Sequence, residues 1–192
     1  MIDVVIPTRH LDRAQAAVDS VSDFAASVTL SMRPEWGFTK QAQAWRGGDQ
    51  PFVLFLNDDC HVTENAVKEL LFPMADQTVG IVGPTLRCGD FQSNPFAAEV
   101  PLDAKGNLPY YIEVRHLIGA CLLVRRSLLQ RIGGWDTQFV LHCSDLDLCI
   151  RSWEAGYKVV WAVRTEVKHD AHMTLNEMAE DERKRILDAD HW

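Results

Sequence analysis

Short apolar runs alternate with segments of helical periodicity along the chain, and polar residues close most of the runs. The runs have the length of strands and lie at residues 2–6, 27–32, 52–56, 79–84, 116–124 and 157–161. Apolar positions recur at helical spacing over residues 11–24, 37–45, 64–72, 125–132 and 144–156. A strand, a helix and a second strand in this order imply a right-handed parallel crossover. The pattern therefore predicts an α/β fold.

The run Phe52–Leu56 carries the first chemical signal, because it ends at Asn57, Asp58 and Asp59. It is too short to span a membrane and follows Pro51, so a buried strand is predicted. A buried parallel strand delivers the residues after it to the carboxyl edge of the sheet, where open α/β folds bind ligands. Adjacent carboxylates there repel each other unless a cation or a donor-rich ligand is bound. The segment indicates a binding site, and a polar cap of the next helix is the alternative.

Composition and charge narrow the function classes. The 192 residues, 47% hydrophobic and 24% charged, fit one globular domain with a substantial core, or two intimately packed halves. A formal net charge of -8 argues against a general binder of nucleic acid or anionic membranes, so a nucleic-acid acceptor is not favoured. The five cysteines are an odd number without a C-x-x-C pair, which favours a reducing, cytoplasmic location. The sequence predicts no signal peptide and no membrane span, and it leaves a homodimer open.

Four separated segments resemble the family 2 glycosyltransferases. Val4–Thr8 resembles their first strand, and Leu56–Asp59 resembles their metal-binding acidic motif, D-x-D. Gly119–Asp136 is similar to their segment "GA-hydrophobic-RR…GGFD", and Ser144–Tyr157 resembles "ED-x-D-L-x-x-R…AGY". The order and spacing of the four segments match the family over roughly residues 2 to 175, and this agreement makes the resemblance specific.

The resemblance implies the GT-A fold, in which a mixed, mainly parallel sheet is flanked by helices. It also implies a single domain over residues 1–192. Residues 1–84 would form the nucleotide-binding half, residues 85–175 the acceptor-binding half, and residues 176–192 a helical C-terminal tail.

A divalent cation in this family neutralises the departing nucleoside diphosphate as a Lewis acid. By resemblance, Asp59 is the direct ligand of Mn²⁺ or Mg²⁺, and Asp58 faces the ribose or the second shell of the metal. Asn57 stands where the motif often has its first Asp, and its amide can still offer an oxygen to the ribose. His169 matches a histidine that many members place after the last strand and is predicted to bind the metal, with His172 as its rival.

The donor is predicted to be a nucleotide sugar, with a UDP-sugar favoured. By resemblance Pro7 and Thr8 border the nucleotide, and Arg9 and Lys40 are the candidates for binding its phosphates. Lys40 follows a glycine-led segment that resembles the one beside the nucleotide in the family. The second strand ends in Ser-Met-Arg-Pro at residues 31–34, where the family usually has Asp-x-Gly-Ser, so the nucleobase stays open.

Asp145 matches the family's base position, and a carboxylate within reach of the acceptor hydroxyl can take its proton. The alternative role is structural, because Ser144 and Asp147 look like a capping pair and acids suit the start of a helix. Asp147 also has Arg151 one turn later as an ion-pair partner, whereas Asp145 is not needed by the cap. We therefore predict that Asp145 is catalytic and that Asp147 is structural or orients the acceptor.

The acceptor side is expected to include Trp135 and Asp136 as well as Asp147, with Trp135 stacking on a sugar. The resemblance implies a metal-dependent, inverting glycosyltransferase that moves one sugar to a hydroxyl of a saccharide, a lipid-linked sugar, a protein or a modified nucleobase. A non-catalytic nucleotide- or sugar-binding relic is the first alternative, since Asn57 and Ser144 depart from the family pattern. A nucleotidyltransferase is the second, although residues 7–10 lack the glycine-rich loop that it would need.

Overall fold

The structure is a computed structural model that describes residues 1–33, 36–45, 47–88, 91–93, 100, 102, 105–170 and 179–190. Its strands are β1 (Ile2–Thr8), β2 (Ala25–Met32), β3 (Phe52–Leu56), β4 (Cys60–His61), β5 (Val79–Cys88), β6 (Phe91–Ser93), β7 (Ile112–Glu113), β8 (Cys121–Arg125) and β9 (Lys158–His169). Its helices are α1 (Leu11–Val21), α2 (Phe38–Ala44), α3 (Glu64–Leu71), α4 (Arg126–Ile132), α5 (Ser144–Glu154) and α7 (Glu180–Ala189), with a 3-10 turn η1 (Pro73–Ala75).

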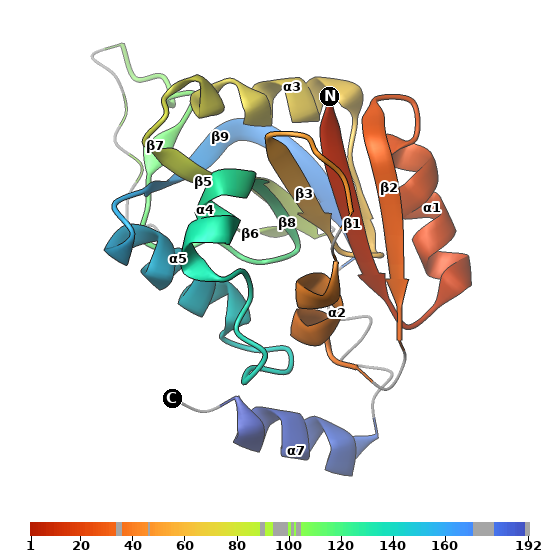
Figure 1. Cartoon of the computed structure of the whole chain (residues 1–192). Coiled ribbons are helices and arrows are strands. Elements are labelled where there is room, and N and C mark those ends of the chain that lie inside the picture. Colours follow the sequence, from red (N-terminus) through yellow and green to blue (C-terminus); the bar gives the residue numbers. More distant parts are fainter. Residues whose placement is uncertain are drawn as a thin grey trace.

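One sheet joins all of these strands, and helices cover both of its faces (Figure 1). The strand order is β2-β1-β3-β8-β5-β9-β4, with β6 paired to β5 and β7 paired to β9. β1 lies parallel to β2 and β3, and β5 lies parallel to β9. β8 runs antiparallel between β3 and β5. The predicted α/β fold with a mixed sheet is therefore confirmed.

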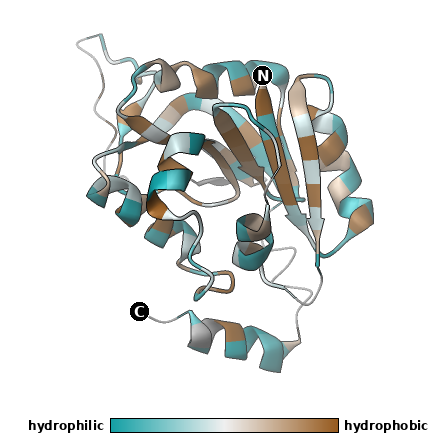
Figure 2. Cartoon of the chain, in the orientation of Figure 1, coloured by the Kyte–Doolittle hydropathy of each residue, from teal (hydrophilic) through white to brown (hydrophobic). Residues whose placement is uncertain are grey.

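The strands alternate their side chains between two apolar cores. Val4, Leu54 and Leu56 point to the core under α1 and α3, where Ala14 and Leu70 are also buried. The neighbouring positions Val5, Val53 and Phe55 point to the core under α2, α4 and α5. Figure 2 shows the resulting hydrophobic strands inside a shell of more hydrophilic helices. β3 is apolar on both faces because both of its faces are covered, as the continuous apolar run predicts.

Two strand pairings bring distant segments to one end of the sheet. Leu56 pairs with Cys121, so the residues after β3 meet those before β8. Cys60 pairs with His169, so the same turn also meets the end of β9. The run predicted as a strand over residues 116–124 is a strand only from Cys121, because the residues before it leave the sheet and contact this end. Among the helices that the structure describes, none combines the length and the apolar character that a bilayer crossing needs.

Candidate functional site

The turn after β3 holds Asp58 and Asp59 at the edge of the sheet, and both are 6% exposed. Thr8, at the end of β1, donates a hydrogen bond from its Oγ1 to Asp58 Oδ2 at 2.6 Å. Arg13 of α1 lies with Nε 3.2 Å from Asp58 Oδ1. Burial raises the pKa of Asp58 and the charge of Asp59 adds to this, although Thr8 and Arg13 oppose it. Asp58 is thus a buried carboxylate that β1 and α1 hold in place.

Asp59 faces the end of β9, where His169 Nε2 lies 3.3 Å from Asp59 Oδ1. The backbone N–H of Asp170 donates to the Asp59 carbonyl at 3.0 Å and locks the two segments together. On its other side His169 Nδ1 lies 3.6 Å from Cys88 Sγ at the end of β5. The predicted rival of His169, His172, lies outside the described residues. Asp59 and His169 are therefore the two predicted metal ligands that the fold brings together.

A divalent cation fits this pair. Asp59 Oδ1 is buried and accepts no hydrogen bond from any residue that the structure describes. Carboxylate oxygen suits Mn²⁺ and Mg²⁺, and an imidazole nitrogen suits a transition metal such as Mn²⁺ better than Mg²⁺. Cys60 lies within the same cluster, where the potential ligand atoms are within 4.8 Å of one another. Burial raises the pKa of the Cys60 thiol well above its ordinary value, and the thiol donates to the Ala120 carbonyl, so it is part of the framework.

Asp145 lies in the first turn of α5, with its side chain 23% exposed. Its Oδ2 accepts the backbone N–H of Gly119 at 2.8 Å, and its Oδ1 accepts that of Leu146 at 2.8 Å. His116 Nε2 lies 3.7 Å from Oδ1. Burial raises the pKa of Asp145, but His116 and the two backbone N–H groups outweigh it and lower the pKa below its ordinary value of 3.8. Asp145 is therefore an ionised carboxylate in a fixed orientation.

Two successive residues join the Asp59 side of this edge to the Asp145 side. Gly119 binds the Asp145 carboxylate, and the next residue, Ala120, accepts the backbone N–H of Asn57 at 2.8 Å through its carbonyl. The acidic turn and the candidate base are thus neighbours across one peptide, although 86 residues separate Asp59 from Asp145 in the sequence. This junction links the two sides of the candidate site.

We predict that Gly119→Ala lowers kcat about tenfold, because a Cβ at this position would lie 3.1 Å from Asp145 Cβ and 3.4 Å from its Oδ2. Such contacts shift the carboxylate by a few tenths of an ångström, and a misplacement of about 1 Å costs roughly 10²-fold. Steady-state kinetics measure the loss. Gly47→Ala is the control, since its Cβ would meet Trp45 Nε1 at a similar 3.2 Å away from Asp145. An unchanged kcat in Gly119→Ala would show that this contact does not position Asp145 for its predicted role.

The remaining donor-side candidates lie around the end of β1. Pro7 is buried within β1, where it pairs with Ser31 of β2. Arg9 forms an ion pair with Glu182 of α7, with Nη1 3.1 Å from Oε1. Lys40 is exposed on α2. Arg9 is thus already engaged by a side chain of the protein, whereas Lys40 faces solvent.

Trp135 does not offer an open stacking face, because it is only 3% exposed. Its ring packs edge to face with Phe38 and Phe55, at centroid distances of 5.1 and 5.2 Å. The backbone N–H of Trp135 donates to Gln43 Oε1, and a Cβ on Gly134 would collide with the same oxygen at 2.2 Å. The side chain therefore packs the core at the junction of α2 and the segment after α4, where sequence reasoning expected a sugar contact.

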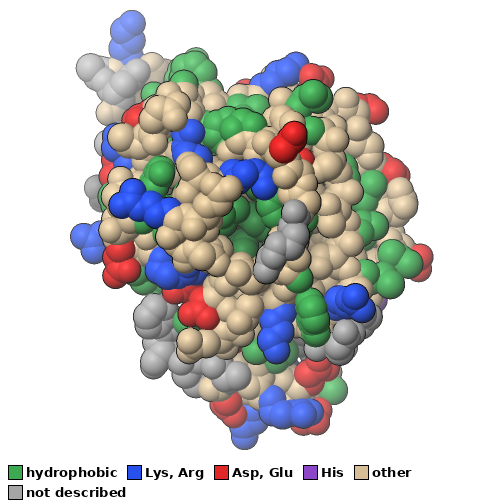
Figure 3. Space-filling view, in the orientation of Figure 1, with side chains coloured by type: hydrophobic (Ala, Val, Ile, Leu, Met, Phe, Trp, Pro, Cys, Tyr) green, Lys and Arg blue, Asp and Glu red, His purple; other side chains and the backbone are tan. Residues whose placement is uncertain are grey.

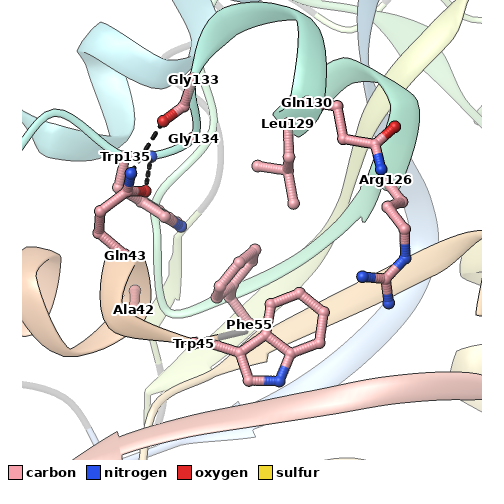
Figure 4. Close-up of a pocket in the computed structure, with 10 residues that line it drawn as sticks. All are labelled: Ala42, Gln43, Trp45, Phe55, Arg126, Leu129, Gln130, Gly133, Gly134 and Trp135. Carbon is pink, nitrogen blue, oxygen red and sulfur yellow. Dashed lines mark hydrogen bonds between the residues drawn. The ribbon is translucent and has the colours of Figure 1, made fainter. Parts of the chain in front are cut away.

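Trp135 borders a pocket of about 320 Å³ between α2 and α4. Figure 3 shows the hollow with hydrophobic side chains at its floor, and Figure 4 shows the residues around it. Its lining comprises Ala42, Gln43, Trp45, Phe55, Arg126, Leu129, Gln130, Gly133, Gly134 and Trp135. None of the acids or histidines of the candidate site belongs to this lining, so the pocket is separate from the sheet edge that carries them.

The start of α5 differs from its predicted cap. Cys143 is the N-cap residue and makes no side-chain cap, and Ser144 is the first helical residue, whose Oγ donates to the Leu141 carbonyl. The cap prediction was wrong because a tight turn with Cys143 at φ 60° precedes the helix. Asp147 forms the predicted ion pair with Arg151. Asp136 accepts the backbone N–H of Gln138 in a local turn, at 2.9 Å.

Sequence reasoning missed Arg13 and His116, which contact Asp58 and Asp145. Arg13 interrupts no periodicity on α1, so no local signal marks it. His116 is a polar residue at the start of an apolar run. A polar residue at the boundary of such a run is a weak signal for a side chain at the edge of the sheet. Sequence reasoning also missed Cys88, the last residue of β5, because a single cysteine there carries no pattern.

No protein-family model matches the sequence. An N-acetylglucosaminyl-diphospho-decaprenol L-rhamnosyltransferase of Mycobacterium tuberculosis is 30% identical over an alignment of 119 residues, and the match covers 50% of this chain and 39% of the relative. The O-antigen biosynthesis protein RfbC of Myxococcus xanthus is 26% identical over an alignment of 160 residues, and the match covers 73% of this chain and 12% of the relative. A pre-mycofactocin glycosyltransferase of Mycobacterium tuberculosis is 28% identical over an alignment of 134 residues, and the match covers 66% of this chain and 28% of the relative. The chain thus spans less than half the length of each of these relatives.

Solved structures share the fold at low sequence identity. GalNAc-T7 with UDP, GalNAc and Mn²⁺ matches with a TM-score of 0.66 and 16% identity over 88% of this chain and 43% of its own. The mannosyltransferase PcManGT of Pyrobaculum calidifontis, in complex with GDP-Man and Mn²⁺, matches with a TM-score of 0.64 and 14% identity over 98% and 68%. The catalytic domain of Drosophila β1,4-galactosyltransferase 7 matches with a TM-score of 0.59 and 14% identity over 100% and 81%.

The fold is the GT-A fold, as the sequence motifs predict. Two of the three relatives are named as glycosyltransferases, and they confirm the resemblance to the family 2 glycosyltransferases that those motifs carry.

Proposed function

We propose that this chain is a metal-dependent, inverting glycosyltransferase that moves one sugar from a nucleotide sugar to an acceptor hydroxyl. The observation that carries the proposal is the junction at Gly119 and Ala120, which sets an ionised carboxylate, Asp145, beside the acidic turn that carries Asp59. A transferase of this kind needs a leaving-group site and a base on neighbouring positions, and this arrangement supplies both.

The nucleotide-binding half would comprise residues 1–84. Asp59 and His169 would hold Mn²⁺ or Mg²⁺, which as a Lewis acid supplies stabilisation of the departing diphosphate. Asp58 would orient the ribose, and Thr8 and Arg13 keep its carboxylate in position. Asn57 would add an amide beside the ribose, and Pro7 would border the nucleotide. Lys40 faces solvent and is free to reach the phosphates, and Arg9 becomes a phosphate ligand on leaving Glu182.

The acceptor-binding half would comprise residues 85–175. Asp145 would accept the proton of the acceptor hydroxyl as its oxygen attacks the anomeric carbon opposite the leaving group. One base and one direct displacement invert the anomeric configuration. The orientation of the Asp145 carboxylate is fixed because Gly119 and Leu146 each donate a backbone hydrogen bond to it. Asp136 would contact the acceptor, and Asp147 would orient this helix turn through Arg151.

The names of the relatives indicate which class of acceptor to test first. The rhamnosyltransferase is named for an N-acetylglucosaminyl-diphospho-decaprenol acceptor, and RfbC is named for O-antigen biosynthesis. A saccharide, free or linked to a lipid diphosphate, is therefore the first acceptor to test. UDP-sugars lead the donor panel, and GDP-sugars are included because PcManGT holds GDP-Man.

A screen for diphosphate release over nucleotide sugars, with and without Mn²⁺, tests the proposal. We expect slow hydrolysis of one donor that requires Mn²⁺, disappears with EDTA, and accelerates when the correct saccharide is added. The anomeric configuration of the product, read by NMR coupling constants, tests inversion. Calorimetry runs in parallel: nucleotide binding without turnover of any donor would favour the relic, and pyrophosphate release from a triphosphate would favour a nucleotidyltransferase.

A further inference from the structure

The residue after α7, Asp190, is a buried carboxylate that binds a loop far away in the sequence. It is 3% exposed. Its Oδ1 accepts the backbone N–H of Val140 at 2.6 Å, and its Oδ2 accepts those of Leu141 and His142 at 2.9 and 2.6 Å. One side chain therefore satisfies three consecutive backbone donors of this loop. These three hydrogen bonds from successive backbone N–H groups to one buried side chain hold residues 140–142 in a fixed conformation.

This loop leads directly into the helix that carries Asp145. Cys143 follows His142 and has φ 60°, the one positive φ among the described residues other than glycine. A residue other than glycine persists in this conformation only when its surroundings hold it there. The loop also contacts α2, where the backbone N–H of Thr39 donates to the Val140 carbonyl at 3.5 Å. Asp190 thus secures the turn that sets the direction of α5 and of Asp145.

The first turn of α7 contacts the side of the candidate site that carries Asp58. Glu182 accepts hydrogen bonds from both Nη1 and Nη2 of Arg9, at 3.1 and 3.2 Å. Arg9 directly follows Thr8, which binds Asp58. Figure 1 shows α7 at the end of the molecule toward which the carboxyl ends of β1 and β2 point. The helix therefore spans from the β1–α1 turn to the loop before α5.

Polar contacts hold α7 in this place. Residues 180–185 are all charged, and Figure 2 shows the helix as largely hydrophilic. Ile186 is only half-buried. Among the side chains of α7 that the structure describes, Glu182 and the adjoining Asp190 therefore supply contacts that fix its position.

We propose that α7 is a strap that couples the two sides of the site, in which Asp190 is a positioning residue for Asp145 and Glu182 withholds Arg9 from the donor phosphates. The inference rests on the proposed function. It predicts opposite consequences for the two ends of one helix. Loss of Asp190 disorders the loop before the base and reduces the chemical step, whereas loss of Glu182 frees a guanidinium for the donor.

Asp190→Ala is expected to lower kcat about 10- to 100-fold while leaving the donor KM within about twofold, because a small displacement of a catalytic group has effects of this size. Asp190→Asn retains an acceptor oxygen and should recover part of the loss. The matched control is Asp188→Ala, an exposed acid two residues earlier. Amide hydrogen exchange of residues 140–142 should accelerate at least about tenfold in Asp190→Ala and stay unchanged in the control, because their acceptor has been removed.

Glu182→Gln is expected to lower the donor KM about two- to fivefold with kcat unchanged, the small effect typical of a half-exposed ion pair. Glu180→Gln, an exposed acid two residues before it, is the control. A donor KM that stays the same or rises in Glu182→Gln overturns the role of that end of the strap.

The outcomes separate this inference from the proposed function. If the wild-type protein turns over no donor, the proposed function fails, and hydrogen exchange at residues 140–142 still decides whether Asp190 holds the loop. Unchanged exchange in Asp190→Ala overturns the strap whatever the activity. Accelerated exchange with an unaltered kcat overturns the positioning role. If Asp190→Asn recovers none of the kcat that Asp190→Ala loses, Asp190 acts in folding alone, and this outcome also overturns the positioning role.

Discussion

Asp145→Asn is expected to lower kcat for sugar transfer by about 10²- to 10⁴-fold, the usual contribution of a general base. Asparagine keeps the shape of the side chain and an oxygen that can accept the Gly119 N–H, but it cannot take a proton from the acceptor. The donor should therefore still bind, with its affinity unchanged by calorimetry, while transfer measured by product formation is lost.

The pH dependence of stability gives a second readout of the same residue. The folded-state pKa of Asp145 is lowered from 3.8, so its ionised form stabilises the fold above that pH. This contribution is lost as the pH falls through the lowered pKa. Asp145→Asn should therefore be less stable than the wild type at neutral pH, and the difference in unfolding free energy should shrink below about pH 4.

Glu64→Gln is the control for Asp145→Asn, because Glu64 is also an acid in the first turn of a helix but lies on α3. It should transfer sugar at the wild-type rate. Near-normal transfer by a folded Asp145→Asn protein would remove Asp145 as the base and would leave the relic or another acid to be considered.

The strands could be predicted from the sequence because burial on both faces leaves continuous apolar runs. Phe52–Leu56 is such a run, and β3 begins and ends where the apolar residues do. The beginning of β8 could not be predicted in the same way. Residues 117–120 are apolar or small, but Gly119 and Ala120 bond to Asp145 and Asn57 in place of a neighbouring strand. A hydrophobic run predicts burial, but burial does not require pairing with a neighbouring strand. Residues 117–120 are a case in which the two differ.

The acids of the candidate site could be found from the sequence because they lie in short motifs at strand and helix ends. Their partners could not. Arg13, His116 and Asp190 each act across a contact that only the folded chain creates, with Asp190 meeting residues about fifty positions earlier. Trp135 shows the reverse problem. Its chemistry suits a sugar, but the packing of Phe38 and Phe55 around it decides that it lies in the core.

Asp59→Ala is expected to abolish Mn²⁺-dependent donor hydrolysis and transfer, by about 10²-fold or more, because Lewis-acid stabilisation of the leaving group is worth several kcal/mol. The same substitution should remove the effect of Mn²⁺ on stability. A ligand that binds only the folded state adds about 2.7 kcal/mol at one hundred times its Kd. Thermal unfolding with and without Mn²⁺ therefore tests Asp59 independently of turnover.

Without the metal, Asp59→Ala should not destabilise the acidic turn after β3, and the unfolding free energy of the protein should not fall. The charge of Asp59 contributes to raising the pKa of Asp58, so its removal relieves a repulsion between two buried carboxylates. Asp76→Ala is the control, since Asp76 is an acid paired with Lys158 away from the cluster of Asp59 and His169. The expected pattern is a variant at least as stable as the wild type in EDTA, but without the gain that Mn²⁺ gives the wild type and Asp76→Ala. A full Mn²⁺ gain in Asp59→Ala would show that the cation binds elsewhere, and it would move the metal half of the proposed site away from the end of β3.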